Sequence, residues 1–124
     1  MERSPLIAAG AVNGALAVAA GAFAAHGLRD HVDARSLEVF DTGARYHMVH
    51  AVAMILAGLL AARWPAVARA GWIFQLGILL FAGSLYALGA TDRELPWLGA
   101  ITPFGGVAFI VGWVWIAVSA LRRE

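Results

Sequence analysis

The chain has 124 residues, enough for a single domain, and its composition is 61% hydrophobic and 14% charged. Soluble globular chains are about 25% charged, and a protein this small cannot bury so much apolar surface in water. The composition therefore excludes an ordinary soluble domain and predicts a membrane protein. The net charge of +1 argues against a nucleic-acid partner, and the absence of cysteine excludes disulfides, thiolate metal sites and thiol catalysis.

Charged residues divide the sequence into uncharged runs, four of which reach the roughly 17–25 residues that a spanning helix needs. We expect helices at about 6–25, 46–62, 70–90 and 98–121. Backbone groups in lipid need internal partners, and uniformly apolar runs find them as helices. The sequence therefore predicts an all-α integral membrane four-helix bundle that forms one domain over residues 1–124.

The first run has an alternative interpretation as a cleaved signal peptide, because Ala22-Phe23-Ala24 resembles a cleavage site. Its apolar stretch is longer than the usual core of about 7–15 residues, and Glu2 lies where such peptides prefer positive charge. We therefore expect the first run to remain as a span.

Small residues share one face of the first expected helix and one face of the fourth, since they recur at steps of three, four or seven. In lipid, such faces let helix backbones approach closely. They predict packing within the bundle, with a homo-oligomer as the alternative. The residues are Gly10, Gly14, Ala17, Gly21 and Ala25 in the first helix and Gly105, Gly112 and Ser119 in the fourth.

Residues 28–45 form the only long polar connection. Asp33 is a candidate N-cap for a helix that begins near Ala34, and the apolar residues beyond it share one helical face. We expect a short amphipathic interfacial segment here, between spans one and two, with a break or bend at Gly43.

The distribution of arginine sets the predicted orientation, because positive residues favour the cytoplasmic side. The side with both termini and the second loop has one arginine more than the other side, so we expect cytoplasmic termini, with a dual-topology dimer as the alternative. The first side carries Arg3, Arg63, Arg69, Arg122 and Arg123, and the second carries Arg29, Arg35, Arg45 and Arg93.

Two amide side chains lie at similar depth in parallel spans. Asn13 is in the first span and Gln75 is in the third. An interhelical hydrogen bond in a membrane contributes about 0.6–2 kcal/mol. We predict that these amides form such a pair, and a contact with a substrate is the alternative.

More polar residues gather toward the opposite membrane face, formed by the first and third loops. Polar groups at membrane depth are costly, so their clustering marks a candidate site. His47 and His50 share a helical face, and we expect His26 to approach them across the hairpin. The candidate cluster consists of His26, Arg45, Tyr46, His47, His50, Ser84, Tyr86, Thr102 and Pro103.

Three interpretations of this cluster compete. In the first, which is our prediction, the polar residues hydrogen-bond one another and hold the bundle together. In the second, they form a pocket for a lipid head group or quinone, with Arg29 or Arg45 near an anionic group. In the third, His26, His47 and His50 ligate a metal or haem.

Enzyme motifs are absent from the sequence: there is no His-Glu-x-x-His, no glycine-rich phosphate loop and no Gly-x-Ser-x-Gly. Ser84 beside a histidine resembles a nucleophile with its base, but a serine within a spanning helix more often bonds a neighbouring helix. No acidic residue lies inside an expected span, which argues against a proton-coupled antiporter. We expect no catalytic residue, no metal and no cofactor.

Specific motifs stand at the same positions. Residues 21–28 read GAFAAHGL and residues 40–51 read FDTGARYHMVHA, while 83–86 read GSLY and 98–106 read LGAITPFGG, followed by Gly112-Trp113. Together they resemble the signature of the YgdD-like family of small bacterial membrane proteins, the domain of unknown function numbered four-two-three. The resemblance spans the chain and departs from the family pattern at Ala24, where glycine is expected.

The resemblance implies four spans and a location in the bacterial inner membrane, with an animal relative in mitochondria and no assigned activity. The family motifs coincide with the candidate cluster at His26, Tyr46, His50, Ser84, Tyr86, Thr102 and Pro103. We therefore expect a non-enzymatic accessory, assembly or lipid-environment protein. Its expected partners are membrane lipids and a homo-oligomer or larger membrane complex. The alternatives are a small oligomeric transporter or channel and a module that binds lipid, quinone or metal.

Overall fold

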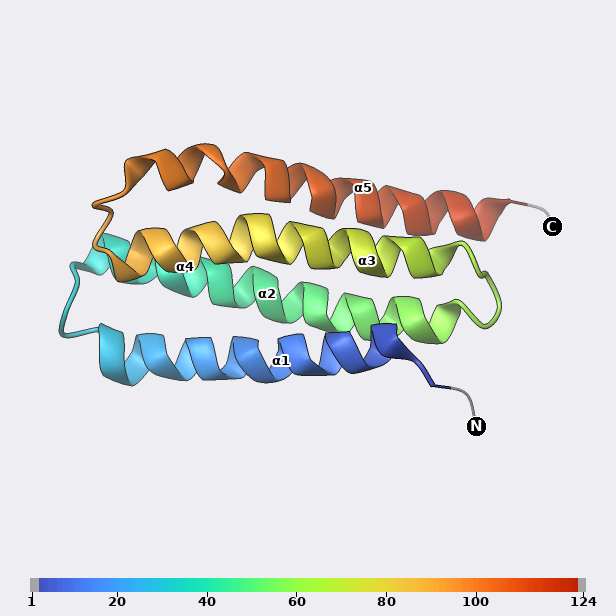
Figure 1. The fold of residues 1–124 in the computed structure, drawn as a ribbon, viewed down its shortest axis with the longest axis horizontal. Helices are drawn as coiled ribbons and strands as arrows, with labels where there is room; N and C mark the ends of the chain where they lie inside the picture. The colour runs from blue at the N-terminus through green and yellow to red at the C-terminus, as the bar shows by residue number, and fades with distance from the viewer. Residues whose placement is uncertain (1–2, 123–124) are drawn as a thin grey trace.

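A computed structural model describes residues 3–122 and shows an antiparallel bundle of long helices (Figure 1). Within these residues, four helical segments are long and apolar enough to cross a membrane: Pro5–Leu28, Ala34–Leu60, Val67–Ala90 and Pro96–Leu121. The predicted all-α four-helix membrane bundle is confirmed. Both termini lie at one end with the connection between spans two and three, and the other two connections lie at the opposite end. Arg123, which enters the arginine count, lies outside the described residues.

The outer surface of the bundle is apolar. Large side chains such as Leu16, Leu79 and Ile110 are more than half exposed, whereas Phe74 and Met54 are completely buried at the centre. This distribution is the one that a bilayer requires, because lipid chains cover the exposed apolar side chains.

The first span is α1 (Pro5–Phe23), which continues into a π-helical turn over Ala24–Leu28. The hydroxyl of Ser4 accepts a hydrogen bond from the Ile7 backbone N–H at 3.2 Å, and Pro5 occupies the first turn, where its missing N–H costs nothing. These local features start the helix at the end of the bundle that carries both termini.

The second span is α2 (Ala34–Leu60). Its N-cap is Asp33, whose carboxylate accepts a hydrogen bond from the Ser36 backbone N–H at 2.8 Å, as predicted. This hydrogen bond holds the pKa of the exposed Asp33 carboxyl below its ordinary value. The amphipathic segment is therefore the beginning of the spanning helix.

The expected break at Gly43 is wrong, because α2 runs through this position without interruption. Gly43 instead lies against the later part of the third span. A Cβ atom at Gly43 would be 3.2 Å from side-chain atoms of Leu85 and Tyr86, so the missing side chain admits a close approach between the two helices.

The third span consists of α3 (Val67–Gly77), a π-helical segment over Ile78–Ala82, and α4 (Gly83–Ala90). The fourth consists of a 3₁₀ turn over Pro96–Ala100 followed by α5 (Thr102–Leu121).

The third and fourth spans interlock through phenylalanine and glycine. Phe109 fills the space above Gly77, Phe81 fills the space above Gly105, and Phe74 fills the space above Gly112. The small-residue face predicted for the fourth helix therefore packs inside the bundle at its two glycines.

The small-residue face of α1 is divided between the interior and the outer surface. A Cβ at Gly10 would lie 3.0 Å from the carbonyl oxygen of Ala51 on α2, whereas a Cβ at Gly14 or Gly21 would meet no described atom within 4 Å. One part of the face packs on α2 and the other is left open. The homo-oligomer stays a prediction.

The first and third connections are tied together at their shared end. Arg93 donates to the Asp33 carboxylate, and the Asp33 backbone N–H donates to the Asp92 carboxylate at 3.2 Å. Asp92 and Arg93 have φ values of 53° and 62°, the left-handed region that non-glycine residues seldom adopt. The turn is therefore held in a strained conformation by contacts with the start of α2.

Candidate functional site

Four polar side chains form a continuous hydrogen-bonded chain through the interior, which we call the polar relay: Tyr86, His47, Asn13 and Gln75. The Tyr86 hydroxyl lies 2.7 Å from His47 Nδ1, and His47 Nε2 lies 2.9 Å from Asn13 Oδ1. The Asn13 Nδ2 group then donates to Gln75 Oε1 at 2.7 Å. The relay therefore links α4, α2, α1 and α3.

The direction of each hydrogen bond in the relay follows from one backbone contact. Asn13 Nδ2 lies 2.8 Å from the carbonyl oxygen of Ala9, which can only accept, so this atom of the amide must be the donor nitrogen. Asn13 Oδ1 then faces His47 and requires a proton on Nε2. In the neutral imidazole Nδ1 is the acceptor, so the Tyr86 hydroxyl donates to it.

The relay joins residues that the sequence predicted to lie in two separate groups. The contact between Asn13 and Gln75 is present as expected from their depth, but His47 belongs with them and not only with the cluster near the loops. The reason is that α2 continues without a break from Ala34 through the expected start of the span near residue 46. At about 1.5 Å per residue, His47 and Asn13 each lie about 20 Å from the first connection and therefore meet.

His50 lies in an aromatic enclosure next to the relay. Its ring stacks on Phe109 with centroids 3.5 Å apart and planes at 6°, and the rings of Phe74 and Trp113 lie 5.3 and 5.9 Å away. The exposed Tyr46 contributes its carbonyl oxygen, which accepts from His50 Nδ1 at 2.7 Å. His50 is therefore 3% exposed and enclosed by side chains of α2, α3 and α5.

The partners of His50 determine its protonation. A carbonyl oxygen only accepts, so Nδ1 carries the proton, and the Trp113 indole N–H only donates, so Nε2, 3.1 Å away, is the acceptor. Both nitrogens are thus occupied in a neutral ring. His47 and His50, three residues apart on one helix, hold opposite tautomers.

A third polar contact joins the last two spans. Ser84 and Thr102 share a hydrogen bond of 2.6 Å between their hydroxyl oxygens, and Ser84 also donates to the carbonyl of Phe81 at 3.0 Å. Pro103, next in sequence, is exposed in the first turn of α5. The structure therefore brings Ser84 and Thr102 together and leaves Pro103 outside the hydrogen-bonded pair.

The expectation that His26 approaches the other histidines is wrong. His26 lies in the π-helical turn at the end of α1 and is exposed, whereas His47 and His50 are buried. Within residues 3–122, no three histidine, cysteine, aspartate or glutamate side chains come close enough to hold a metal ion. The three-histidine metal or haem site is therefore not formed by this structure.

Arg45 is also not directed at the candidate cluster. It is exposed on α2, where its guanidinium lies 3.7 Å from the Asp41 carboxylate and 3.3 Å from the Thr42 hydroxyl. Pairing within its own helix explains how an arginine is accommodated twelve residues into a spanning segment.

The sequence motif that contains Trp113 does not reveal its hydrogen bond to His50. No spacing rule connects a residue of α5 to His50. The available signal was the indole N–H itself, because a donor at membrane depth needs an acceptor.

The comparisons with known proteins agree with this architecture. A family model described as "Protein of unknown function (DUF423)" matches residues 20–106, more than half of the chain. The chain belongs to this family. The resemblance inferred from the motifs is thereby confirmed, and the DUF423 chain is a membrane protein.

Curated relatives match the DUF423 chain over nearly its whole length. The UPF0382 membrane protein YwdK of Bacillus subtilis is 47% identical over 116 residues, which cover 91% of this chain and 93% of the relative. A UPF0382 membrane protein of Haemophilus influenzae is 41% identical over 118 residues, which cover 92% and 91%. One from Staphylococcus epidermidis is 40% identical over 114 residues, which cover 91% and 92%. No solved structure matches the chain.

Proposed function

We propose that this protein is a non-enzymatic accessory protein of the bacterial inner membrane, which acts through the shape and surface of its bundle. The observation that carries the proposal is the hydrogen bonding of the two buried histidines. Both ring nitrogens of His47 and of His50 are engaged by neighbouring side chains or backbone. A metal ligand or a general base needs a free lone pair, and these rings offer none without breaking an interhelical contact.

The geometry of the Ser84 hydroxyl supports the same interpretation. A serine nucleophile needs a base within hydrogen-bond reach, usually a histidine. Ser84 instead pairs with Thr102 and its own helix. Its hydroxyl therefore contributes to packing between the third and fourth spans.

The distribution of acidic residues argues against the alternative of a proton-coupled transporter. The acidic residues within 3–122 lie in 30–41 and 92–94, at the end of the bundle formed by the first and third connections. None of them contacts His47 or His50 among the described hydrogen bonds and ion pairs. A relay that ends in two amides lacks the titratable acid that proton transport usually requires.

We place both termini in the cytoplasm because the end that holds them has Arg3, Arg63, Arg69 and Arg122 and no described acidic residue. The same positive end favours contact with anionic lipid head groups at the cytoplasmic surface.

Elemental analysis and absorption spectroscopy of the purified full chain test the proposal. We expect no stoichiometric metal and no visible-region band, and no solute flux above that of empty vesicles after reconstitution. A Soret band or one metal ion per chain would overturn the proposal in favour of a redox or metal module. Flux that disappears in His50→Ala but persists in His26→Ala would overturn it in favour of a transporter, since only His50 lies in the buried cluster.

A further inference from the structure

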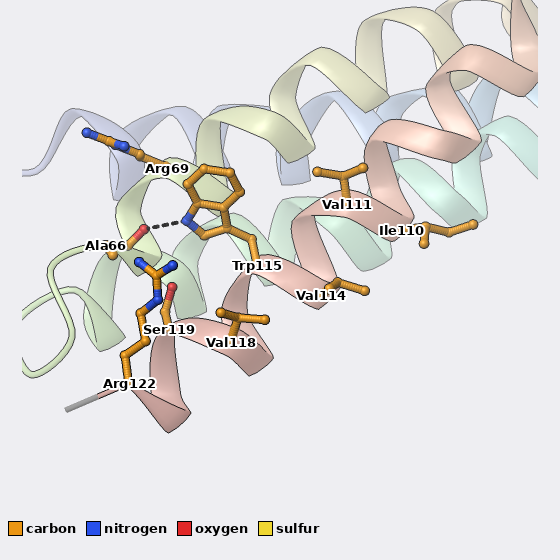
Figure 2. A pocket seen from close by; sticks show the side chains of 9 residues that line it. All are labelled: Ala66, Arg69, Ile110, Val111, Val114, Trp115, Val118, Ser119 and Arg122. Atoms are coloured by element: carbon orange, nitrogen blue, oxygen red, sulfur yellow. Dashed lines mark hydrogen bonds between the residues drawn. The ribbon is translucent and has the colours of Figure 1, made fainter.

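A groove lies between the beginning of the third span and the second half of α5 (Figure 2), and no residue of the polar relay lines it. Its volume is about 490 Å³. Two arginines, one serine and a tryptophan line it together with aliphatic side chains. The lining residues are Ala66, Arg69, Ile110, Val111, Val114, Trp115, Val118, Ser119 and Arg122.

The groove has a charged end and an apolar end. Figure 2 shows Arg69 and Arg122 near Ala66, at the end of the bundle that carries the termini, while the aliphatic side chains continue toward Ile110. At about 1.5 Å per residue, the helix rises about 18 Å from Arg122 to Ile110. Half of the hydrocarbon core measures about 15 Å. The groove thus matches the length of one bilayer leaflet, with its charges at the membrane surface.

No acidic side chain of the described part of the chain pairs with the two arginines of the groove. Both are exposed, and within residues 3–122 neither forms an ion pair, since the described acidic residues lie at the opposite end of the bundle. Two guanidinium groups at one membrane surface are complementary to a phosphate group, which they bind through several donors at once.

A serine side chain in the groove provides a second, independent observation. Ser119 is 8% exposed and lines the groove, and Figure 2 shows its side chain beside Arg122. Within residues 3–122 no hydrogen bond of the Ser119 hydroxyl is described, and its oxygen is not among the fully enclosed polar atoms, so it is accessible from the groove and free to donate to a ligand there. The neighbouring Trp115 indole N–H is already used, because it donates to the Ala66 carbonyl at 3.0 Å.

We propose that this groove binds one anionic phospholipid. Arg69 and Arg122 bind the phosphate, the Ser119 hydroxyl donates to a glycerol or ester oxygen, and one acyl chain lies along the aliphatic side chains of α5. The charges select an anionic head group, and the apolar part of the groove distinguishes a phospholipid from free phosphate.

This inference deepens the proposed accessory role and rests on it for its significance, but the two fail separately. If the protein binds no lipid, the hydrogen-bonded histidines still support an accessory role. If the protein carries a metal or transports a solute, the groove still supports lipid binding.

Native mass spectrometry of the full chain in detergent, with added phosphatidylglycerol or phosphatidylcholine, tests the proposal. We expect one phosphatidylglycerol to be retained per chain in preference to phosphatidylcholine, and excess inorganic phosphate to leave it bound. The double substitution Arg69→Gln with Arg122→Gln should weaken phosphatidylglycerol binding about 30-fold, since each arginine at an anionic surface contributes about a 5-fold effect.

Two matched controls make the result decisive. Arg29→Gln with Arg35→Gln removes the same charge at the opposite end and should leave binding unchanged. Val114→Trp fills the groove and should abolish retention, whereas Val107→Trp, at an exposed position of α5 that does not line the groove, should not.

Equal weakening by the two arginine pairs, or equal retention of both lipids, would show an adventitious surface lipid and overturn the proposal. Binding that survives Val114→Trp would overturn it as well, and this outcome does not depend on whether the arginine variants fold. Displacement by inorganic phosphate alone would replace the lipid with a free anion as the ligand.

Discussion

The hydrogen bond between Asn13 and His47 provides the sharpest test of the polar relay. Asn13→Leu changes the side chain to an apolar one of similar size and removes the contacts with His47 and Gln75. Interhelical hydrogen bonds in membranes contribute about 0.6–1.7 kcal/mol each. The free energy of unfolding should therefore fall by about 1–3.5 kcal/mol.

The second half of the test is the coupling between the two positions. His47→Leu alone leaves the Asn13 oxygen without a donor, and Asn13→Leu alone leaves the His47 Nε2 proton without an acceptor. The double variant loses the hydrogen bond once and leaves neither of these two atoms unpaired. The two single losses should therefore exceed the double loss by about 1–3 kcal/mol.

Reversible unfolding in mixed micelles, measured for wild type, both single variants and the double variant, gives this coupling energy. A coupling within about 0.5 kcal/mol of zero would refute the reasoning, because residues that do not interact give additive losses.

Three further predictions concern other parts of the bundle. Wild type should be more stable than Asp33→Asn above about pH 4, because the Asp33 carboxylate is then charged. This difference in stability should disappear as the pH falls through the lowered pKa of Asp33 in the folded chain. Melting curves recorded from pH 2 to 7 measure it. Gly105→Ala should lower the free energy of unfolding by about 1–3 kcal/mol, because the added Cβ would overlap the third span. Gly14→Ala, at an open position, should leave that free energy unchanged or raise it in the same micelle assay. Equal effects of the two substitutions would contradict the described packing. The changes in melting temperature caused by His26→Ala and His50→Ala should add in the double variant, because His26 is exposed and His50 is buried. A double variant that departs clearly from the sum would place the two residues in contact.

The sequence predicts the spans well because uncharged runs report directly on the bilayer. It also predicts the capping of α2 by Asp33 and the meeting of Asn13 with Gln75, since both depend only on local chemistry or on depth along a helix.

The sequence predicts the second span at about 46–62, with His47 at its beginning, whereas α2 begins at Ala34 and continues through this position. Charged residues do not mark the end of this helix, because Arg45 pairs with Asp41 on its exposed face. A helix of 27 residues is about 40 Å long, about 10 Å more than the hydrocarbon core. Its charged beginning therefore extends toward the head groups while His47 reaches the middle.

The contacts around His50 depend on packing that spacing alone does not reveal. The π-helical segment over Ile78–Ala82 changes the direction of side chains in the third span, and no residue type in that segment signals it. The stacking of His50 on Phe109 and its hydrogen bond to Trp113 depend on how α5 meets the other helices.

The most direct test of the proposed function is the state of the two buried histidines in a bilayer, measured by ¹⁵N solid-state NMR of histidine-labelled protein. His47→Gln and His50→Gln assign the signals. The described hydrogen bonds predict two neutral rings of opposite tautomer, with the proton on Nε2 of His47 and on Nδ1 of His50. A doubly protonated or metal-shifted ring, or the same tautomer at both positions, would contradict a core in which neighbouring groups engage both nitrogens of each buried histidine.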